Sequence, residues 1–177
     1  MEISDAKWHL QKGFTLIETM LVLGFAGIIL AGATGFYLVS KANSQATQLA
    51  SDVESVSGVV DRYLMGYGRP AADTDMNQML IDSGKLPSGM RSNGQGSMLN
   101  TYGGQTDVAY ANNSYTVTLT GIPRSGCISF LTNLPSKWTS VSVSGAEAVT
   151  EVPLNVQTAQ TSCSGEMNSI VLTRETF

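Results

Sequence analysis

The sequence predicts an α+β protein in which one long N-terminal helix packs on a small, mostly antiparallel β-sheet domain. Two observations predict this class. An uncharged apolar run over residues 19–39 leads into a helical pattern that stops near Gly66, and the alternating strand patterns all come after Gly104. A helix followed by a group of strands is typical of α+β domains. The long helix would then form the spine of the molecule.

The apolar run extends over residues 14–39, and its only charged residue is Glu18. As a helix it would be about 39 Å long, which is enough to cross a bilayer. Small residues let apolar helices approach closely. They are frequent here: Gly24, Ala26, Gly27, Ala31, Gly32, Ala33 and Gly35. The run therefore predicts either a plain membrane anchor or an anchor that also packs in a bundle of identical helices.

Apolar residues continue at helical spacing after this run. They are Ala42, Ala46, Leu49, Val53, Val56, Val60 and Tyr63. The pattern stops at Gly66-Tyr67-Gly68-Arg69-Pro70, a cluster of helix-breaking residues. We therefore expect one helix whose second half packs on a domain, with a coiled coil as the alternative.

The next segment predicts a short helix and then a loop. Asp73-Thr74-Asp75 can cap a helix over Met76–Asp82, and Gly84 can end it. Residues 85–100 are rich in Gly, Ser, Asn and Met and show little periodicity, so we expect a loop there.

The remaining residues predict the sheet. Residues 107–111 and 115–120 are expected to form a hairpin that turns at Asn112-Asn113. Residues 125–134 predict a short helix that carries Cys127 and stops before Pro135. Residues 140–144 and 169–174 predict two further strands.

The residues before the apolar run differ from an ordinary secretory signal peptide. In such a peptide the apolar region precedes the cleavage site. Here the run follows Gly13, so cleavage at that point would leave it on the mature protein. Lys7 and Lys12 precede the run and Lys41 follows it, which modestly favours a cytoplasmic N-terminus and an exported C-terminal domain.

Residues Gly13-Phe14-Thr15-Leu16-Ile17-Glu18 resemble the processing site of type IV pilins. The resemblance implies that a prepilin peptidase cuts after Gly13 and methylates the new N-terminus at Phe14. It also implies that Glu18 directs assembly. The chain would then divide into a cleaved leader (residues 1–13), a transmembrane and filament-core half of the helix (14–39), and a globular domain that includes the amphipathic half (40–177).

Three later segments resemble the type IVb pilins, which include bundle-forming pilins and the thin-pilus pilins of conjugative plasmids. The segments are Asn100-Thr101-Tyr102-Gly103-Gly104, Gly126-Cys127-Ile128-Ser129 and Val141-Ser142-Val143-Ser144-Gly145. The short leader and Phe14 follow the type IVa pattern instead.

The resemblance implies a structural major subunit that polymerises through its apolar helix into an extracellular filament. Such a filament would serve adhesion, aggregation or mating contact. The implied partners are identical subunits, the prepilin peptidase, the pilus assembly machinery, and surface receptors on host or bacterial cells. Before assembly the subunit would span the bacterial inner membrane once, with its C-terminal domain in the periplasm.

The chain has two cysteines, Cys127 and Cys163, both in the part expected to be exported. An even pair in an oxidising compartment predicts a disulfide, here one that closes a C-terminal loop of the sheet domain. Two buried free thiols are the alternative.

The composition argues against catalysis by the mature chain. The only histidine, His9, lies in the expected leader, which excludes histidine-dependent triads and metal sites from the mature protein. Asp73, Asp75 and Asp82 do not have the spacing of an EF-hand, and a helix cap explains them better. We expect no enzyme activity, no metal and no cofactor. The net charge of −4 and the pI near 4.8 also predict no specific nucleic acid partner.

Two other functions remain open at this point. One is a minor pilin or a pseudopilin of a type II secretion system, which would share the N-terminal motif. The other, from a different class, is a membrane-anchored enzyme or ligand-binding protein.

Overall fold

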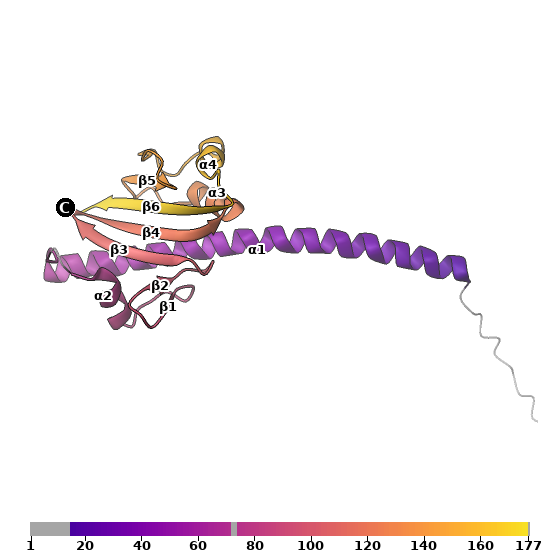
Figure 1. Ribbon diagram of the computed structural model, residues 1–177, viewed down its shortest axis with the longest axis horizontal. Coiled ribbons are helices and arrows are strands. Elements are labelled where there is room, and N and C mark those ends of the chain that lie inside the picture. Colours follow the sequence, from indigo (N-terminus) through magenta and orange to yellow (C-terminus); the bar gives the residue numbers. More distant parts are fainter. Residues whose placement is uncertain (1–14, 72–73, 177) are drawn as a thin grey trace, which may run out of the picture. The chain divides into compact units, whose positions relative to one another are not determined.

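The computed structural model describes residues 15–71 and 74–176, and its helices and strands form the α+β arrangement that the sequence predicts (Figure 1). Contacts divide the chain into two compact units, with the boundary after Val39. Helix α1, Leu16–Tyr67, begins in the first unit and ends in the second. Gly68 ends it in a left-handed conformation with φ of 78°, and its N–H donates to the Leu64 carbonyl at 3.0 Å. This is the usual helix ending at glycine, as the sequence pattern predicts.

Helix α2, Met76–Asp82, has the predicted bounds, and the Asp75 side chain accepts a hydrogen bond from the Gln78 N–H at 3.0 Å. The expected loop over residues 85–100 is partly wrong. It contains two short strands, β1 at Arg91–Ser92 and β2 at Met98–Leu99, which pair with each other. Two-residue strands are too short to show an alternating pattern in the sequence.

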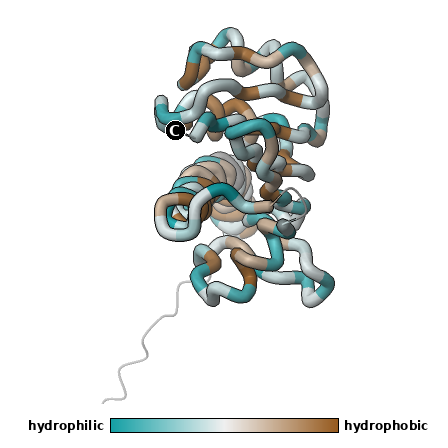
Figure 2. Tube along the Cα trace, turned by 90° about the vertical axis from the view of Figure 1, so that its left-hand side faces the viewer, coloured by the Kyte–Doolittle hydropathy of each residue, from teal (hydrophilic) through white to brown (hydrophobic). Residues whose placement is uncertain are grey.

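The second unit contains a six-stranded sheet with the order β1-β2-β3-β4-β6-β5, in which every neighbouring pair is antiparallel. The longer strands are β3 (Gln105–Ala111), β4 (Ser114–Pro123), β5 (Ser140–Val143) and β6 (Met167–Glu175). The expected hairpin is confirmed, since Asn112 and Asn113 take φ values of 50° and 64° at its turn. Buried and less buried residues alternate along much of these strands, and hydrophobic and hydrophilic residues interleave along the chain (Figure 2).

Two short helices flank the sheet. Helix α3, Arg124–Thr132, follows β4 directly, and it begins one residue before and ends two residues before the predicted helix over residues 125–134. Helix α4, Val156–Ser162, is predicted by no pattern in the sequence. Its only buried residue is Ala159, so it has no apolar stripe that periodicity could reveal.

The core lies between the domain half of α1 and the sheet. Strands β3, β4 and β6 run alongside that half of the helix (Figure 1). The helix residues Leu49, Val53, Val56 and Val60 are fully buried, and so are the strand residues Tyr115, Val117, Leu119, Ile170 and Leu172. All belong to one hydrophobic cluster. The predicted stripe is thus covered by the chain's own sheet, which accounts for it without a coiled coil.

A polar network crosses this interface and ties the last strand to the helix. Arg174 of β6 forms an ion pair with Asp61 of α1 at 3.1 Å and donates to Ser57 Oγ at 2.9 Å. The Tyr115 hydroxyl lies 2.9 Å from Ser57 Oγ and donates to Asp61 Oδ1 at 3.3 Å. Burial is the main reason that the pKa of Tyr115 rises to about 12.

The raised pKa of Tyr115 predicts a loss of stability at high pH. The folded state keeps the phenolic proton above pH 10, where the unfolded chain has released it, so folding is favoured less as pH rises from 10 to 12. The loss should be on the order of 2 kcal/mol over that range. Urea unfolding of the detergent-solubilised chain between pH 8 and 11.5 measures it. Tyr115→Phe should start less stable but show a shallower decline, and equal slopes would contradict the assignment.

Candidate functional site

Residues 16–37 of α1 expose apolar side chains that a soluble domain would bury. Leu16, Ile17 and Phe36, for example, are 73%, 75% and 82% exposed. An 18-residue window of this helix has a mean hydropathy of 2.1, which is sufficient in length and composition to cross a membrane. None of that window is buried within the chain, in contrast to the core helix of a soluble protein. This segment therefore requires lipid or other protein chains around it.

Glu18 lies in the first turn of α1 and is exposed. The Glu18 N–H donates to the Thr15 carbonyl at 3.0 Å and to Thr15 Oγ1 at 3.4 Å. A carboxylate near a helix N-terminus is favoured by the helix dipole. Gly13 and Phe14 lie outside the described residues, so the expected cleavage and methylation stay predictions, as does the role of Glu18.

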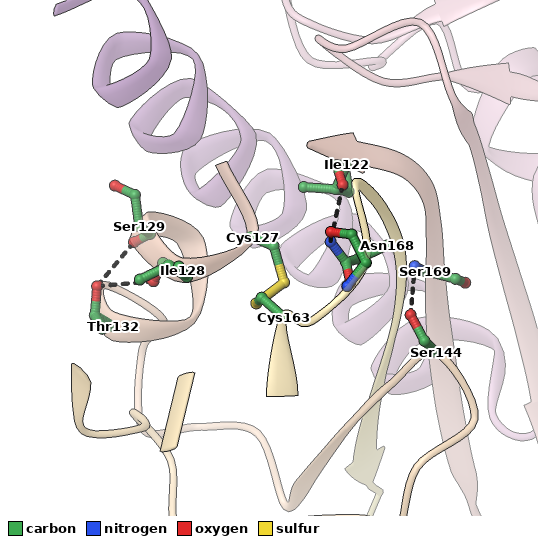
Figure 3. Close-up of a disulfide and its surroundings, with 10 residues drawn as sticks. Ile122, Cys127, Ile128, Ser129, Thr132, Ser144, Cys163, Asn168 and Ser169 are labelled. Atoms are coloured by element: carbon green, nitrogen blue, oxygen red, sulfur yellow. Dashed lines mark hydrogen bonds between the residues drawn. A yellow bond between two sulfur atoms is a disulfide. The ribbon is translucent and has the colours of Figure 1, made fainter. Parts of the chain in front are cut away.

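Cys127 and Cys163 are joined by a disulfide, which excludes the alternative of two free thiols (Figure 3). Cys127 lies in α3 and Cys163 ends α4, with a Cα–Cα distance of 6.0 Å, and both residues are fully buried. Beside the bond, the Asn168 side chain donates to the Gly165 carbonyl at 2.9 Å and to the Ile122 carbonyl at 3.4 Å. The bond therefore holds α4, whose only buried residue is Ala159, against α3.

Cys163→Ser should lower the free energy of unfolding by roughly 3–4 kcal/mol, because the loop between the two cysteines would no longer be closed in the unfolded chain. Urea unfolding of the detergent-solubilised chain measures the change. The double variant with Cys127→Ser, which leaves no single thiol to mispair, is the control and should show a similar loss. A wild-type midpoint in both variants would contradict a stabilising role for the bond.

Asp52 is a buried carboxylate in the domain half of α1. It is only 1% exposed and accepts hydrogen bonds from Gln48 Nε2 at 2.8 Å, Thr101 Oγ1 at 3.2 Å and the Gly89 N–H at 3.4 Å. Its position next to Val53 of the apolar stripe is the one signal that could have indicated burial. Asp52 joins the helix to the segment before β3.

The next question is whether the described residues form a metal site or a catalytic site. Among residues 15–71 and 74–176, no three His, Cys, Asp or Glu side chains come together as metal ligands. One open hollow is lined by Arg124, Ser125, Ile128, Ser164 and Glu166. None of these five lining residues is a histidine that could act as a base for the two serines, so they do not by themselves provide the nucleophile and base of a hydrolase.

Comparison with known proteins decides the family. The family model described as "PilS N terminal" matches residues 39–175, most of the chain. The chain belongs to this family of type IV pilins. The resemblance inferred from the sequence motifs, including the likeness to type IVb pilins, is thus confirmed.

Two relatives of this pilin show how far the similarity extends. The major structural subunit of the bundle-forming pilus of Escherichia coli O127:H6 is 26% identical, over 79% of this chain and 75% of the relative. The toxin coregulated pilin of Vibrio cholerae is 23% identical, over 78% of this chain and 65% of the relative. The similarity therefore includes most of the domain.

Solved structures share the fold of this pilin. The crystal structure of TcpA, a type IV pilin from Vibrio cholerae El Tor biotype, aligns with a TM-score of 0.53 at 13% identity, over 75% of this chain and 99% of that one. The NMR structure of the type IVb pilin PilS from Salmonella typhi aligns with a TM-score of 0.52 at 21% identity, over 72% of this chain and 94% of that one. At these identities the likeness supports the fold alone.

Proposed function

We propose that this pilin is the structural major subunit of a type IVb-like pilus and polymerises through its apolar N-terminal helix. The observation that carries the proposal is the contrast within α1. Its domain half is covered by the chain's own sheet, whereas residues 15–37 are all exposed and are mostly apolar, with Glu18 as their only charged residue. A segment of this kind can be buried first by lipid and later by the same segment of other subunits. The relatives named as major pilus subunits support the same conclusion.

In this proposal the subunit occupies two locations, one before assembly and one after it. Before assembly the subunit spans the bacterial inner membrane once, and its disulfide-closed domain folds in the oxidising periplasm. A prepilin peptidase removes residues 1–13 and methylates Phe14, and the assembly machinery then transfers the subunit to an extracellular filament. The role is structural and not enzymatic. The filament would serve adhesion, aggregation or mating contact through surface receptors.

The protein content of filaments sheared from cells that express this chain tests the proposal. Filaments sheared from wild-type cells should contain this chain as the dominant protein, and a deletion strain should lose the filaments. A chain present at a small fraction of another pilin would identify it as a minor pilin. A chain that stays in the membrane fraction while filaments persist would favour a pseudopilin or an anchored ligand-binding protein.

A further inference from the structure

The motif Asn100-Thr101-Tyr102-Gly103-Gly104 has no part in the function proposed above. It forms the turn between β2 and β3, and it contacts α1 at two places. Thr101 Oγ1 donates to Asp52 Oδ2 at 3.2 Å, and the Tyr102 hydroxyl donates to the Ala42 carbonyl at 3.3 Å. Ala42 and Asp52 are about 15 Å apart along the helix axis. The turn therefore spans the first turns of the domain half of α1.

The turn itself is held rigidly. Asn100 is 5% exposed, and its Oδ1 accepts hydrogen bonds from the N–H groups of Tyr102 at 2.9 Å and Gly104 at 3.2 Å. Its Nδ2 donates to the Thr120 carbonyl of β4 at 2.9 Å. A side chain at Gly104 would overlap that carbonyl, so only glycine fits there. These bonds hold the Tyr102 backbone against the sheet, and the Tyr102 side chain extends from there to the helix.

Helix α3 also confines the Tyr102 side chain. A Cβ added to Gly126 in α3 would overlap the Tyr102 hydroxyl, so the missing side chain at Gly126 makes room for the ring. Burial raises the pKa of Tyr102, in keeping with this enclosed position. Residues 15–37, 40 and 41 are all exposed, and Ala42 is the first described residue of α1 that is partly buried. Tyr102 thus contacts the helix where it leaves the domain.

We propose that the turn at residues 100–104 fixes the point at which α1 leaves the globular domain, with Tyr102 as the positioning residue. The bond to the Ala42 carbonyl holds the first turn of the covered half of the helix against the sheet. The inference rests on the proposed function in one respect: a defined exit point matters because the apolar segments of many subunits must pack together in a filament.

Hydrogen exchange of the full chain in detergent micelles tests the positioning directly, without a filament. Tyr102→Phe keeps the ring beside Gly126 and removes only the hydroxyl. Peptides that cover residues 42–48 should exchange roughly threefold to tenfold faster, the effect expected for one lost hydrogen bond. Gly126→Ala, which displaces the ring, should accelerate exchange in the same peptides.

Tyr110→Phe is the matched control. Tyr110 lies in β3. Its hydroxyl is buried and has no hydrogen-bond partner within the described part of the chain. Its removal should leave exchange at residues 42–48 unchanged. The proposal is overturned if Tyr102→Phe exchanges as wild type there, or if the faster exchange spreads evenly over the domain.

Filament counts on cells test the link to assembly. Tyr102→Phe should give fewer filaments than wild type at equal subunit levels, and wild-type counts despite faster exchange would overturn that link. If wild-type cells themselves form no filaments of this chain, the proposed function fails while the exchange result still decides the positioning role.

Discussion

Glu18→Ala is expected to leave the subunit folded and inserted in the membrane but to reduce filament formation to few or none. In a packed filament core the Glu18 carboxylate would be nearly free of water, so it needs a positive partner. The α-amino group of Phe14 is the proposed partner, in the same chain or in a neighbouring subunit, since methylation leaves it able to carry charge. Removal of one member of such a buried pair costs about 3–5 kcal/mol for each subunit added.

Filament counts by electron microscopy, at matched subunit levels on immunoblots, measure the effect of Glu18→Ala. Glu54→Ala is the control on the same helix. The Glu54 side chain is 55% exposed and forms an ion pair with Lys137 at 2.9 Å on the surface of the domain. Exposed pairs contribute little, so this variant should assemble normally. Normal filament counts with Glu18→Ala would show that Glu18 merely lies in the headgroup region and that its charge is incidental.

Gly13→Val should block the maturation of the subunit and abolish filaments altogether. A β-branched side chain at the proposed cleavage site would restrict the backbone that the peptidase must reach at the membrane surface. The uncut chain should accumulate in the inner membrane with residues 1–13 still attached. Mass spectrometry of the membrane fraction measures the intact mass.

Gly13→Ala is the matched control, because alanine adds only a methyl group and should preserve a larger share of processing. The wild-type subunit from filaments should begin at Phe14 and carry one added methyl group. Filament subunits of wild-type cells that begin at Met1 would contradict the proposed cleavage.

Much of the fold follows from periodic patterns along the chain. The apolar stripe through Leu49, Val53 and Val56 predicted the covered half of α1, and the Asn112-Asn113 pair predicted the β3–β4 turn. Both signals are local, since a helix face or a tight turn is encoded by adjacent residues. The disulfide was also predictable, from the cysteine count and the expected export.

Features that depend on distant contacts were not predictable. Strand β1 pairs with β2, strand β2 also pairs with β3, and α4 is held by the disulfide at Cys163. The burial of Asp52 depends on Thr101 and Gly89, both far away in the sequence. No local pattern encodes such partners, which come together only when the chain folds.

A three-dimensional reconstruction of filaments sheared from wild-type cells tests the central claim most directly. We expect a filament built from this chain, with residues 14–39 of every subunit packed in the core and the disulfide-closed domain on the outside. A filament whose density fits another protein, or one in which residues 14–39 lie on the outer surface, would contradict it.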